Sequence, residues 1–298
     1  MLKKIFGNYI WHNIRISKPL IYNPNMAGNI NIYQYNESSH AKTFVATTTQ
    51  GNLNYYLLPN ILYYLEWQSN SNSYKLVKFT GQVRMISDTI QNFRDLGGWQ
   101  ADGGTIKYGR IYRSATSDKL SEGTINALRL GKIVDLREPS ELESPTAASA
   151  KIREISSVDS YNVYGTRVRN AVYKIMQAVV DNKNVLFNCL WGKDRTGTVA
   201  YVIEGLLGAD LESRLRDYDL TWFYYQRSDR YIEYVSDLIH QFDEFKKTTY
   251  EQEQFIKWFL KSSTNKTADL DLINQFRKAM INGTPHEYKL SGDNIVLK

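Results

Sequence analysis

An apolar pentapeptide, a short glycine-containing loop and a regular helical pattern follow one another in residues 184–208, NVLFNCLWGKDRTGTVAYVIEGLLG. The run NVLFN (184–188) is long enough for one buried strand. Apolar side chains then recur with a helical period, and Gly208 stands where that helix should end. A strand that leads through a loop into a helix is the repeating unit of α/β folds, so this segment constrains the fold more than any other.

The same unit recurs upstream. SEGTINALRLGK (121–132) predicts a helix with Ser121 as its N-cap and Gly131 as its stop, and KIVDL (132–136) predicts a short buried strand. A second helical period covers 167–183, and residues 209–284 read as helical, including the aromatic stretch 221–234 and the helix 269–283. The alternation predicts a three-layer α/β domain over residues 87–284, with a central, mostly parallel sheet flanked by helices.

Residues 17–86 follow a different pattern. Short β-rich runs are separated by Asn, Ser, Gly and Pro: NINIYQY (29–35), KTFVATT (42–48), LNYYLL (53–58), ILYYLEW (61–67) and YKLVKFT (74–80). This spacing predicts a small all-β sandwich, with the polar tract QSNSNS (68–73) as a hairpin tip. Residues 1–16 are then an N-terminal segment and residues 285–298 a C-terminal tail.

Charge and composition exclude several classes of protein. The formal net charge is +6, but the lysines and arginines are scattered among carboxylates, which disfavours nucleic-acid binding and suits an anionic substrate. The chain shows neither a signal peptide nor an apolar stretch of about 20 residues, so we expect a cytoplasmic protein that does not enter a membrane. The abundance of Asn, Lys, Tyr and Ile also fits a phage-encoded protein, even a virion component.

Cys189, the only cysteine of the chain, is either a small buried side chain or a nucleophile. Backbone N–H groups of the loop after it can converge on an anion, and a helix that begins near Asp194 adds its positive end. Gly192 allows a sharp turn or a close approach, and Arg195 can offer its planar fork to two phosphate oxygens. This positive environment would favour the thiolate that attacks phosphorus.

Other phosphate and nucleophile motifs fit less well. The nucleotide-binding P-loop fails because position 187 is Phe and the residue after Lys193 is Asp194. GGWQADGG (97–104) lacks the spacing of a dinucleotide fingerprint. A Cys–His hydrolase is disfavoured because all four histidines are far from the cysteine in sequence; they are His12, His40, His240 and His286.

The Cys-x5-Arg motif with the ending GKDRTG resembles the bacterial atypical tyrosine phosphatases of the cysteine-dependent superfamily. Further elements match in order: NFRDLGGW (92–99), IKYGRIYRSA (106–115), IVDLREPSELE (133–143) and RDYDLT (216–221). The resemblance covers roughly residues 86–284. The β-rich region before it is similar to the fibronectin- or immunoglobulin-like module that some gut-bacterial members carry.

The resemblance implies a role for each matching residue. Cys189 would form a phosphocysteine intermediate, and Arg195 would bind the phosphoryl oxygens. Asp194 would protonate the leaving group. Asp135 is its rival for that role, or else anchors Arg137 or a helix N-terminus. Thr196 would hydrogen-bond the Cys189 sulfur. The substrate-binding residues would be Asn188, Leu190, Trp191, Gly192 and Lys193.

Three details of this resemblance bear on function. Lys193 adds a cation that is shared with relatives that also accept phosphoinositides. Arg94 and Asp95 are expected either to brace the loop wall or to form a buried salt bridge. The family normally has histidine immediately before the cysteine, where this chain has the uncharged Asn188, so we expect reduced activity.

The resulting prediction is a protein-tyrosine phosphatase that hydrolyses phosphomonoesters, with phosphotyrosine the first substrate and phosphoinositides open. It would need no metal or other cofactor. The alternative is a catalytically weak or inactive pseudophosphatase that serves as a structural or adaptor protein. In either case the N-terminal β module could bind a protein partner.

Overall fold

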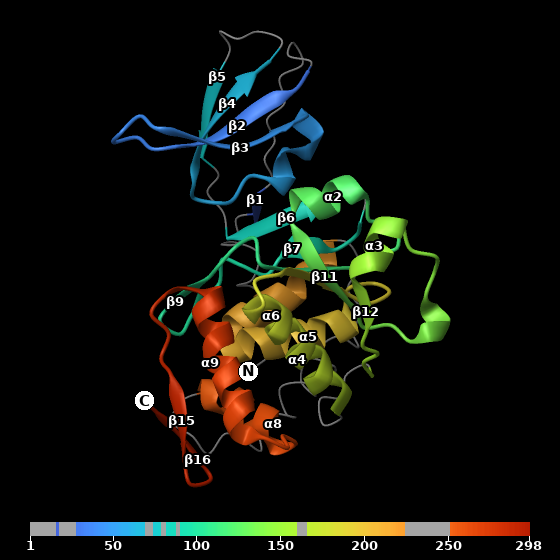
Figure 1. Ribbon diagram of the computed structural model, residues 1–298, viewed down its shortest axis with the longest axis vertical. Helices are drawn as coiled ribbons and strands as arrows, with labels where there is room; N and C mark the ends of the chain where they lie inside the picture. The colour runs from blue at the N-terminus through green and yellow to red at the C-terminus, as the bar shows by residue number, and fades with distance from the viewer. Residues whose placement is uncertain are drawn as a thin grey trace.

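The computed structural model describes residues 16–17, 28–68, 74–78, 82–87, 90–159, 166–223 and 251–298. Figure 1 shows a small β-sheet at one end of the molecule and a larger body of sheet and helices at the other. Apart from Ile16, the predicted segment 1–16 lies outside these ranges. The predicted hairpin tip 68–73 also lies outside them except for Gln68, as does most of the aromatic stretch 221–234.

The larger body is built on a seven-stranded sheet. Its order is β1 (Ile16–Ser17), β6 (Val83–Ser87), β7 (Phe93–Asp95), β10 (Ile111–Ser114), β13 (Asn184–Asn188), β11 (Leu130–Asp135) and β12 (Arg153–Ile155). Strand β7 runs antiparallel to both of its neighbours. The other four pairings are parallel, which confirms the predicted mostly parallel sheet.

Helices cover both faces of this sheet because successive side chains of a strand point to opposite sides. Val134, Val185 and Phe187 join one core with the helices α4 (Thr166–Val180), α5 (Asp194–Leu207), α8 (Glu251–Lys261) and α9 (Lys266–Met280). Ile133 and Leu186 face the other way, into a core with α2 (Glu122–Ala127) and α3 (Ala147–Ile152). The predicted three layers are therefore present.

Helix α2 begins as predicted but ends early. The Ser121 side chain accepts a hydrogen bond from the Thr124 N–H and caps the helix. The helix ends at Ala127 rather than at Gly131, because Arg129 takes up a left-handed conformation with φ 52° and the chain enters β11 at Leu130. Gly131 lies inside that strand.

The N-terminal region forms a four-stranded antiparallel sheet in the order β3 (Lys42–Thr48), β2 (Ile30–Tyr35), β4 (Leu62–Trp67) and β5 (Tyr74–Lys78). The predicted strand 53–58 is wrong. Gln50–Tyr55 is instead a 3-10 helix (η1), and Leu53 and Leu57 pack one turn apart beneath the sheet. Strands β1 and β6, which lie across the two boundaries of the predicted module 17–86, pair with each other in the central sheet. The described residues of this region hold one sheet and not the two of a sandwich.

The C-terminal part returns to the larger body. Helices α6 (Leu211–Asp219), α8 and α9, with the 3-10 turn η3 (Leu220–Phe223), confirm the predicted helical content within the described ranges. The predicted helix 269–283 extends too far, because its last three residues form the strand β14 (Ile281–Gly283). This strand pairs with β9 (Gly104–Ile106), which in turn pairs with β8 (Gln100–Ala101). The predicted tail forms a hairpin of β15 (Tyr288–Ser291) and β16 (Asn294–Leu297).

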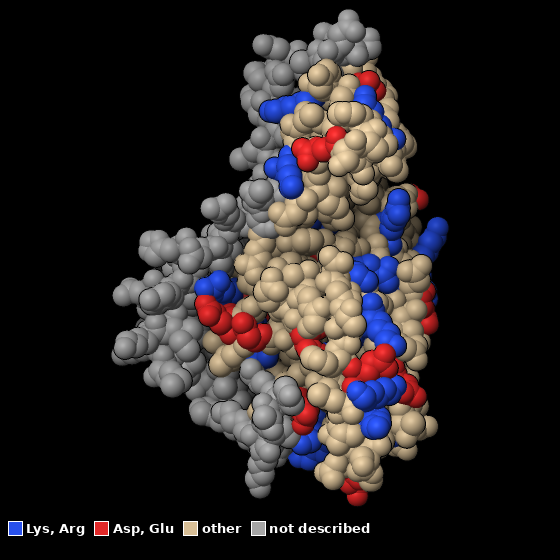
Figure 2. Space-filling view, turned by 90° about the vertical axis from the view of Figure 1, so that its left-hand side faces the viewer, with Lys and Arg blue, Asp and Glu red and all other residues tan. Residues whose placement is uncertain are grey.

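Basic and acidic side chains are interspersed over the face seen in Figure 2, and the described residues in view form no broad patch of one sign. None of the helices in the described ranges has the length and the apolar character needed to cross a membrane.

Candidate active site

The cysteine stands where three parallel strands end. Asn188, the last residue of β13, is paired with Ser114 of β10 on one side and Asp135 of β11 on the other. Loops beyond the carboxyl ends of parallel strands are the usual place for ligands in α/β folds. Cys189 is the next residue and is a free thiol, 3% exposed.

The loop after Cys189 turns sharply at Gly192, where φ is 64°. A Cβ atom on this residue would lie 2.5 Å from the carbonyl carbon and oxygen of Ser114, so only glycine fits. Helix α5 begins two residues later at Asp194, with Lys193 as its N-cap residue. Cys189 and Arg195 are thus joined by a strand end, one tight loop and the first turn of a helix.

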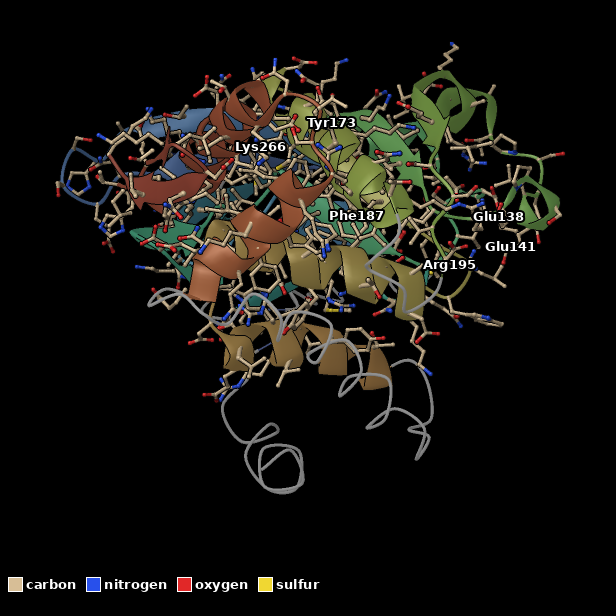
Figure 3. The ribbon with its side chains drawn as sticks, turned by 90° about the horizontal axis from the view of Figure 1, so that it is seen from below. Glu138, Glu141, Tyr173, Phe187, Arg195 and Lys266 are labelled. Atoms are coloured by element: carbon tan, nitrogen blue, oxygen red, sulfur yellow. The ribbon has the colours of Figure 1, made fainter. Side chains whose placement is uncertain are left out.

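Arg195 is held by Glu141, a residue for which sequence analysis had assigned no role. Nη1 and Nη2 of Arg195 donate to Oε2 and Oε1 of Glu141 at 2.5 and 2.7 Å. Glu141 ends the 3-10 turn η2 (Pro139–Glu141) and also accepts the Glu138 N–H at 2.8 Å. Figure 3 shows Glu138, Glu141 and Arg195 together on the right-hand side of the view, with Phe187 of β13 nearer its centre.

Arg195 and Glu141 stabilise each other's charged forms. The Arg195 guanidinium holds the pKa of Glu141 at about 2. The pKa of Arg195 is raised, first by its hydrogen bonds to Glu141 and further by its electrostatic interaction with Cys189. A guanidinium has five N–H donors, and in the described part of the chain Glu141 takes two of those of Arg195, which leaves Nε and one N–H on each terminal nitrogen for an anion.

The other predicted loop residues surround this point. The Asp194 carboxylate is half-buried and accepts the Tyr218 hydroxyl at 3.4 Å. Thr196 is buried, and among the described residues its hydroxyl makes no hydrogen bond, so the predicted bond to the Cys189 sulfur is not formed in this structure. A buried hydroxyl without a partner is costly, and a bound anion could satisfy it. Leu190 and Lys193 are half-buried, and the Trp191 side chain is 55% exposed at the loop tip.

Asp135 is fully buried and is held by arginine. Its Oδ1 accepts the backbone N–H and Nε of Arg137 at 3.2 and 2.9 Å, and its Oδ2 accepts Nη2 at 2.7 Å. Arg137 also contacts both carboxylate oxygens of Asp118, at 2.7 and 2.8 Å. Asp135 therefore takes the anchoring position that was the alternative to its catalytic role.

Asn188 points its amide toward a neighbouring loop. Its Oδ1 accepts the Ser117 hydroxyl at 2.9 Å. Its Nδ2 is buried and has no hydrogen-bond partner among the residues described. Of the two polar atoms of this side chain, which replaces the expected histidine, only Oδ1 therefore has a hydrogen-bond partner among the described residues.

Arg94 and Asp95 do not pair with each other. Asp95 accepts Arg84 Nη1 at 2.9 Å and the backbone N–H groups of Gly97 and Gly109. Arg94 donates to Asp217 on α6, 123 residues away in sequence. Sequence analysis assigned no role to Asp217.

A sequence profile described as the tyrosine phosphatase family matches residues 86–272. The chain belongs to the tyrosine phosphatase family. This confirms the family predicted from the cysteine loop and its four companion elements. The match begins after the N-terminal sheet, so the likeness of that region to a fibronectin- or immunoglobulin-like module stays a prediction.

This member of the tyrosine phosphatase family is 31% identical over 171 residues to a protein of Cupriavidus necator that is provisionally named a tyrosine-protein phosphatase, H16_A0669. The alignment covers 46% of this chain and 63% of that protein, so the chain spans less than two thirds of its relative's length.

Similarity to solved structures is lower. TpbA of P. aeruginosa is 17% identical, with a TM-score of 0.40, over 54% of this chain and 89% of TpbA. Tk-PTP in its active form is 18% identical, with a TM-score of 0.34, over 44% of this chain and 92% of Tk-PTP. Superpositions this partial carry no argument about activity.

Proposed function

We propose that the protein is a phosphomonoesterase that transfers the phosphoryl group of phosphotyrosine to Cys189 and then to water. The observation that carries this proposal is the arrangement of Cys189 and Arg195, joined by a loop that turns at Gly192. A thiolate beside a guanidinium and a helix N-terminus is the chemistry that a dianionic phosphate ester requires.

In the first step the Cys189 thiolate attacks phosphorus and the bond from phosphorus to the phenolic oxygen breaks. Arg195 stabilises the negative charge that spreads over the transferring oxygens. The two contacts to Glu141 support this role, because they fix one edge of the guanidinium and leave Nε directed elsewhere. Water then attacks the phosphocysteine, which releases inorganic phosphate and restores the thiolate.

Asp194 is our choice for the acid that protonates the leaving phenolate and then deprotonates the attacking water. It stands at the start of α5, one residue before Arg195. Among the described residues, the Tyr218 hydroxyl is the one group that hydrogen-bonds to its carboxylate. Asp135 is bound by three donors of Arg137, which leaves its carboxylate little freedom to exchange a proton with substrate.

Phosphotyrosine is favoured over shorter phosphoesters because the sulfur lies below the surface, with Cys189 only 3% exposed. A phosphate on a long aryl group reaches such an atom more easily than one on a serine side chain. Asn188, Leu190, Trp191, Gly192 and Lys193 would line the approach. Phosphoinositides remain a second class of substrate to test, because Lys193 adds positive charge at the rim.

The direct test is hydrolysis of p-nitrophenyl phosphate in the presence of a chelator by the wild-type chain, Cys189→Ser and Arg195→Lys. We expect turnover by the wild type, none by Cys189→Ser, and a loss of about 100-fold or more for Arg195→Lys, which keeps the charge but not the fork. Wild-type turnover no faster than that of Cys189→Ser would instead support the pseudophosphatase, in which phosphorylated ligands are bound but not hydrolysed.

A further inference from the structure

The carbonyl oxygen of Gly192 is held from inside the protein. It accepts the Asn92 amide Nδ2 at 2.8 Å and Arg113 Nη2 at 2.9 Å. Both donors are fully buried and lie about 100 and 79 residues before Gly192 in sequence. Two residues earlier in the loop, the Leu190 carbonyl accepts the Thr116 N–H at 3.2 Å.

These contacts determine how the loop amides point. In a planar trans peptide the carbonyl of one residue and the N–H of the next are directed to opposite sides. Because the Gly192 carbonyl is turned toward Asn92 and Arg113, the Lys193 N–H is turned away from them. By the same geometry, the Leu190 carbonyl turns the Trp191 N–H away from Thr116. An anion bound inside the loop needs N–H groups so directed.

The two donors belong to a closed ring of hydrogen bonds. Arg113 Nη1 donates to Asp217 Oδ2, and Asp217 Oδ1 accepts Arg94 Nε at 2.9 Å. Arg94 Nη1 in turn donates to the Oδ1 of Asn92, whose Nδ2 returns to the Gly192 carbonyl. We call the four side chains Asn92, Arg94, Arg113 and Asp217 the brace ring.

The brace ring is buried and contains more cationic than anionic groups. Its members are at most 1% exposed, and it contains two guanidinium groups and one carboxylate. Glu204 of α5 is buried nearby, and neither of its oxygens has a hydrogen-bond partner within the described part of the chain. Burial, together with the charge of Asp217, raises the pKa of Glu204 well above its usual value. The ring itself therefore has one more guanidinium than carboxylates.

We propose that Arg113, held by Asp217, is a positioning residue for phosphate: it fixes the Gly192–Lys193 peptide so that its N–H meets the phosphoryl group. The proposal rests on the proposed phosphatase function for its meaning in catalysis, but it concerns oxyanion binding and can be tested without turnover. Asn92 is the second donor to the same carbonyl.

The test measures binding of inorganic phosphate by calorimetry in the Cys189→Ser chain, with and without Arg113→Lys. Lysine keeps the charge but cannot donate to the Gly192 carbonyl and to Asp217 with the geometry of a guanidinium. We expect the dissociation constant for phosphate to rise roughly 10- to 100-fold. In the chain that retains Cys189, kcat/KM should fall by a similar factor.

Two further variants separate positioning from stability. Asn92→Gly removes the other donor while keeping the backbone, because Asn92 has φ 57° and glycine adopts that conformation readily; we expect phosphate binding to weaken roughly 3- to 10-fold. The control is Arg84→Lys, which alters the buried pair with Asp95; none of the hydrogen bonds of Arg84 to described residues is to the loop. It should change phosphate affinity by less than about twofold.

The outcomes are distinct. Unchanged phosphate affinity in a folded Arg113→Lys chain would overturn the proposal, as would an equal loss in Arg84→Lys or an absence of phosphate binding when Arg113 is intact. If Arg113→Lys does not fold, Asn92→Gly decides in the same way. If the wild type hydrolyses no aryl phosphate but loses phosphate affinity on Arg113→Lys, the phosphatase function fails while the positioning role stands.

Discussion

Both terminal nitrogens of Arg195 donate to the two carboxylate oxygens of Glu141, 54 residues away in sequence. The pairing joins the first turn of α5 to the turn that follows β11, and so connects the loop between Cys189 and Arg195 to its neighbour. The pairing also makes the protein's stability depend on pH in a defined way.

The first prediction concerns acid stability. The pKa of Glu141 in the folded protein is about 2, against an ordinary value of 4.5, because Arg195 stabilises the carboxylate. The stabilisation is therefore complete above pH 4.5 and is lost as the pH falls through 2. We expect Glu141→Gln to lower the free energy of unfolding at neutral pH, and the difference from wild type to shrink below pH 4.5.

Urea denaturation at several pH values measures this difference. The matched control is Glu143→Gln, two residues along the chain and exposed. If the difference in the free energy of unfolding between wild type and Glu141→Gln stays constant down to about pH 3, the ion pair is not the source of that difference.

The second prediction separates the two aspartates. Asp194→Asn should lower kcat by about 10- to 100-fold for phenyl phosphate and much less for p-nitrophenyl phosphate, whose leaving group needs no proton. Asp135→Asn should lower the rates for both substrates equally. It should also cost about 3 kcal/mol of stability, because it leaves the buried Arg137 with one partner fewer. If only Asp135→Asn showed the leaving-group dependence, the two roles would be exchanged.

The third prediction concerns the residue before the cysteine. Asn188→His places an ionisable ring where an amide nitrogen now lacks a partner among the described residues. An imidazolium there would favour the Cys189 thiolate, so the rate of alkylation by iodoacetamide near pH 6.5 should rise several-fold. Cys189→Ser provides the unlabelled baseline. An unchanged rate in a folded variant would remove Asn188 as the reason for expecting weak activity.

The fourth prediction uses two glycines with almost the same backbone. Gly192 has φ 64° and Gly292 has φ 61°, but a Cβ atom meets the Ser114 backbone at 2.5 Å in the first case and nothing within 4 Å in the second. Gly292→Ala should cost about 1 kcal/mol of stability from backbone strain alone. Gly192→Ala should cost a further ~1–3 kcal/mol and abolish phosphate binding. Equal losses in the two variants would show that the contact with Ser114 does not matter.

Sequence reasoning located α4 and α5 well because each carries a long apolar pattern of helical period, and β13 because its apolar run leads directly into α5 through the loop. It misplaced features that depend on a single backbone conformation or on a distant partner. The left-handed backbone conformation of Arg129 ends α2, and no sequence pattern predicts that conformation. Residues 281–283 continue the composition of α9 but become a strand because β9 offers them an edge.

In the candidate site, too, relations between residues close in sequence could be predicted, and relations between distant residues could not. Cys189, Gly192 and Arg195 lie within seven consecutive residues, so their relation could be predicted from the order of strand, loop and helix. Glu141, Asn92, Arg113 and Asp217 all lie in the sequence elements that match the family. Their contacts with Arg195, with the Gly192 carbonyl and between Arg113 and Asp217 span 54 to 104 residues, however, and such distances are closed only by the folded sheet.

The attachment of β14 to β9 has a consequence for biosynthesis. Phe276 and Met280 of α9 pack in the same core as Cys189, and Arg277 pairs with Asp102 beside β8. A nascent chain that has already exposed the loop between Cys189 and Arg195 must therefore wait until residues beyond 280 leave the ribosome before this core can close. Until then the apolar side of α5 lacks its contacts with α9, and we expect chaperone binding during translation to be strongest in that interval.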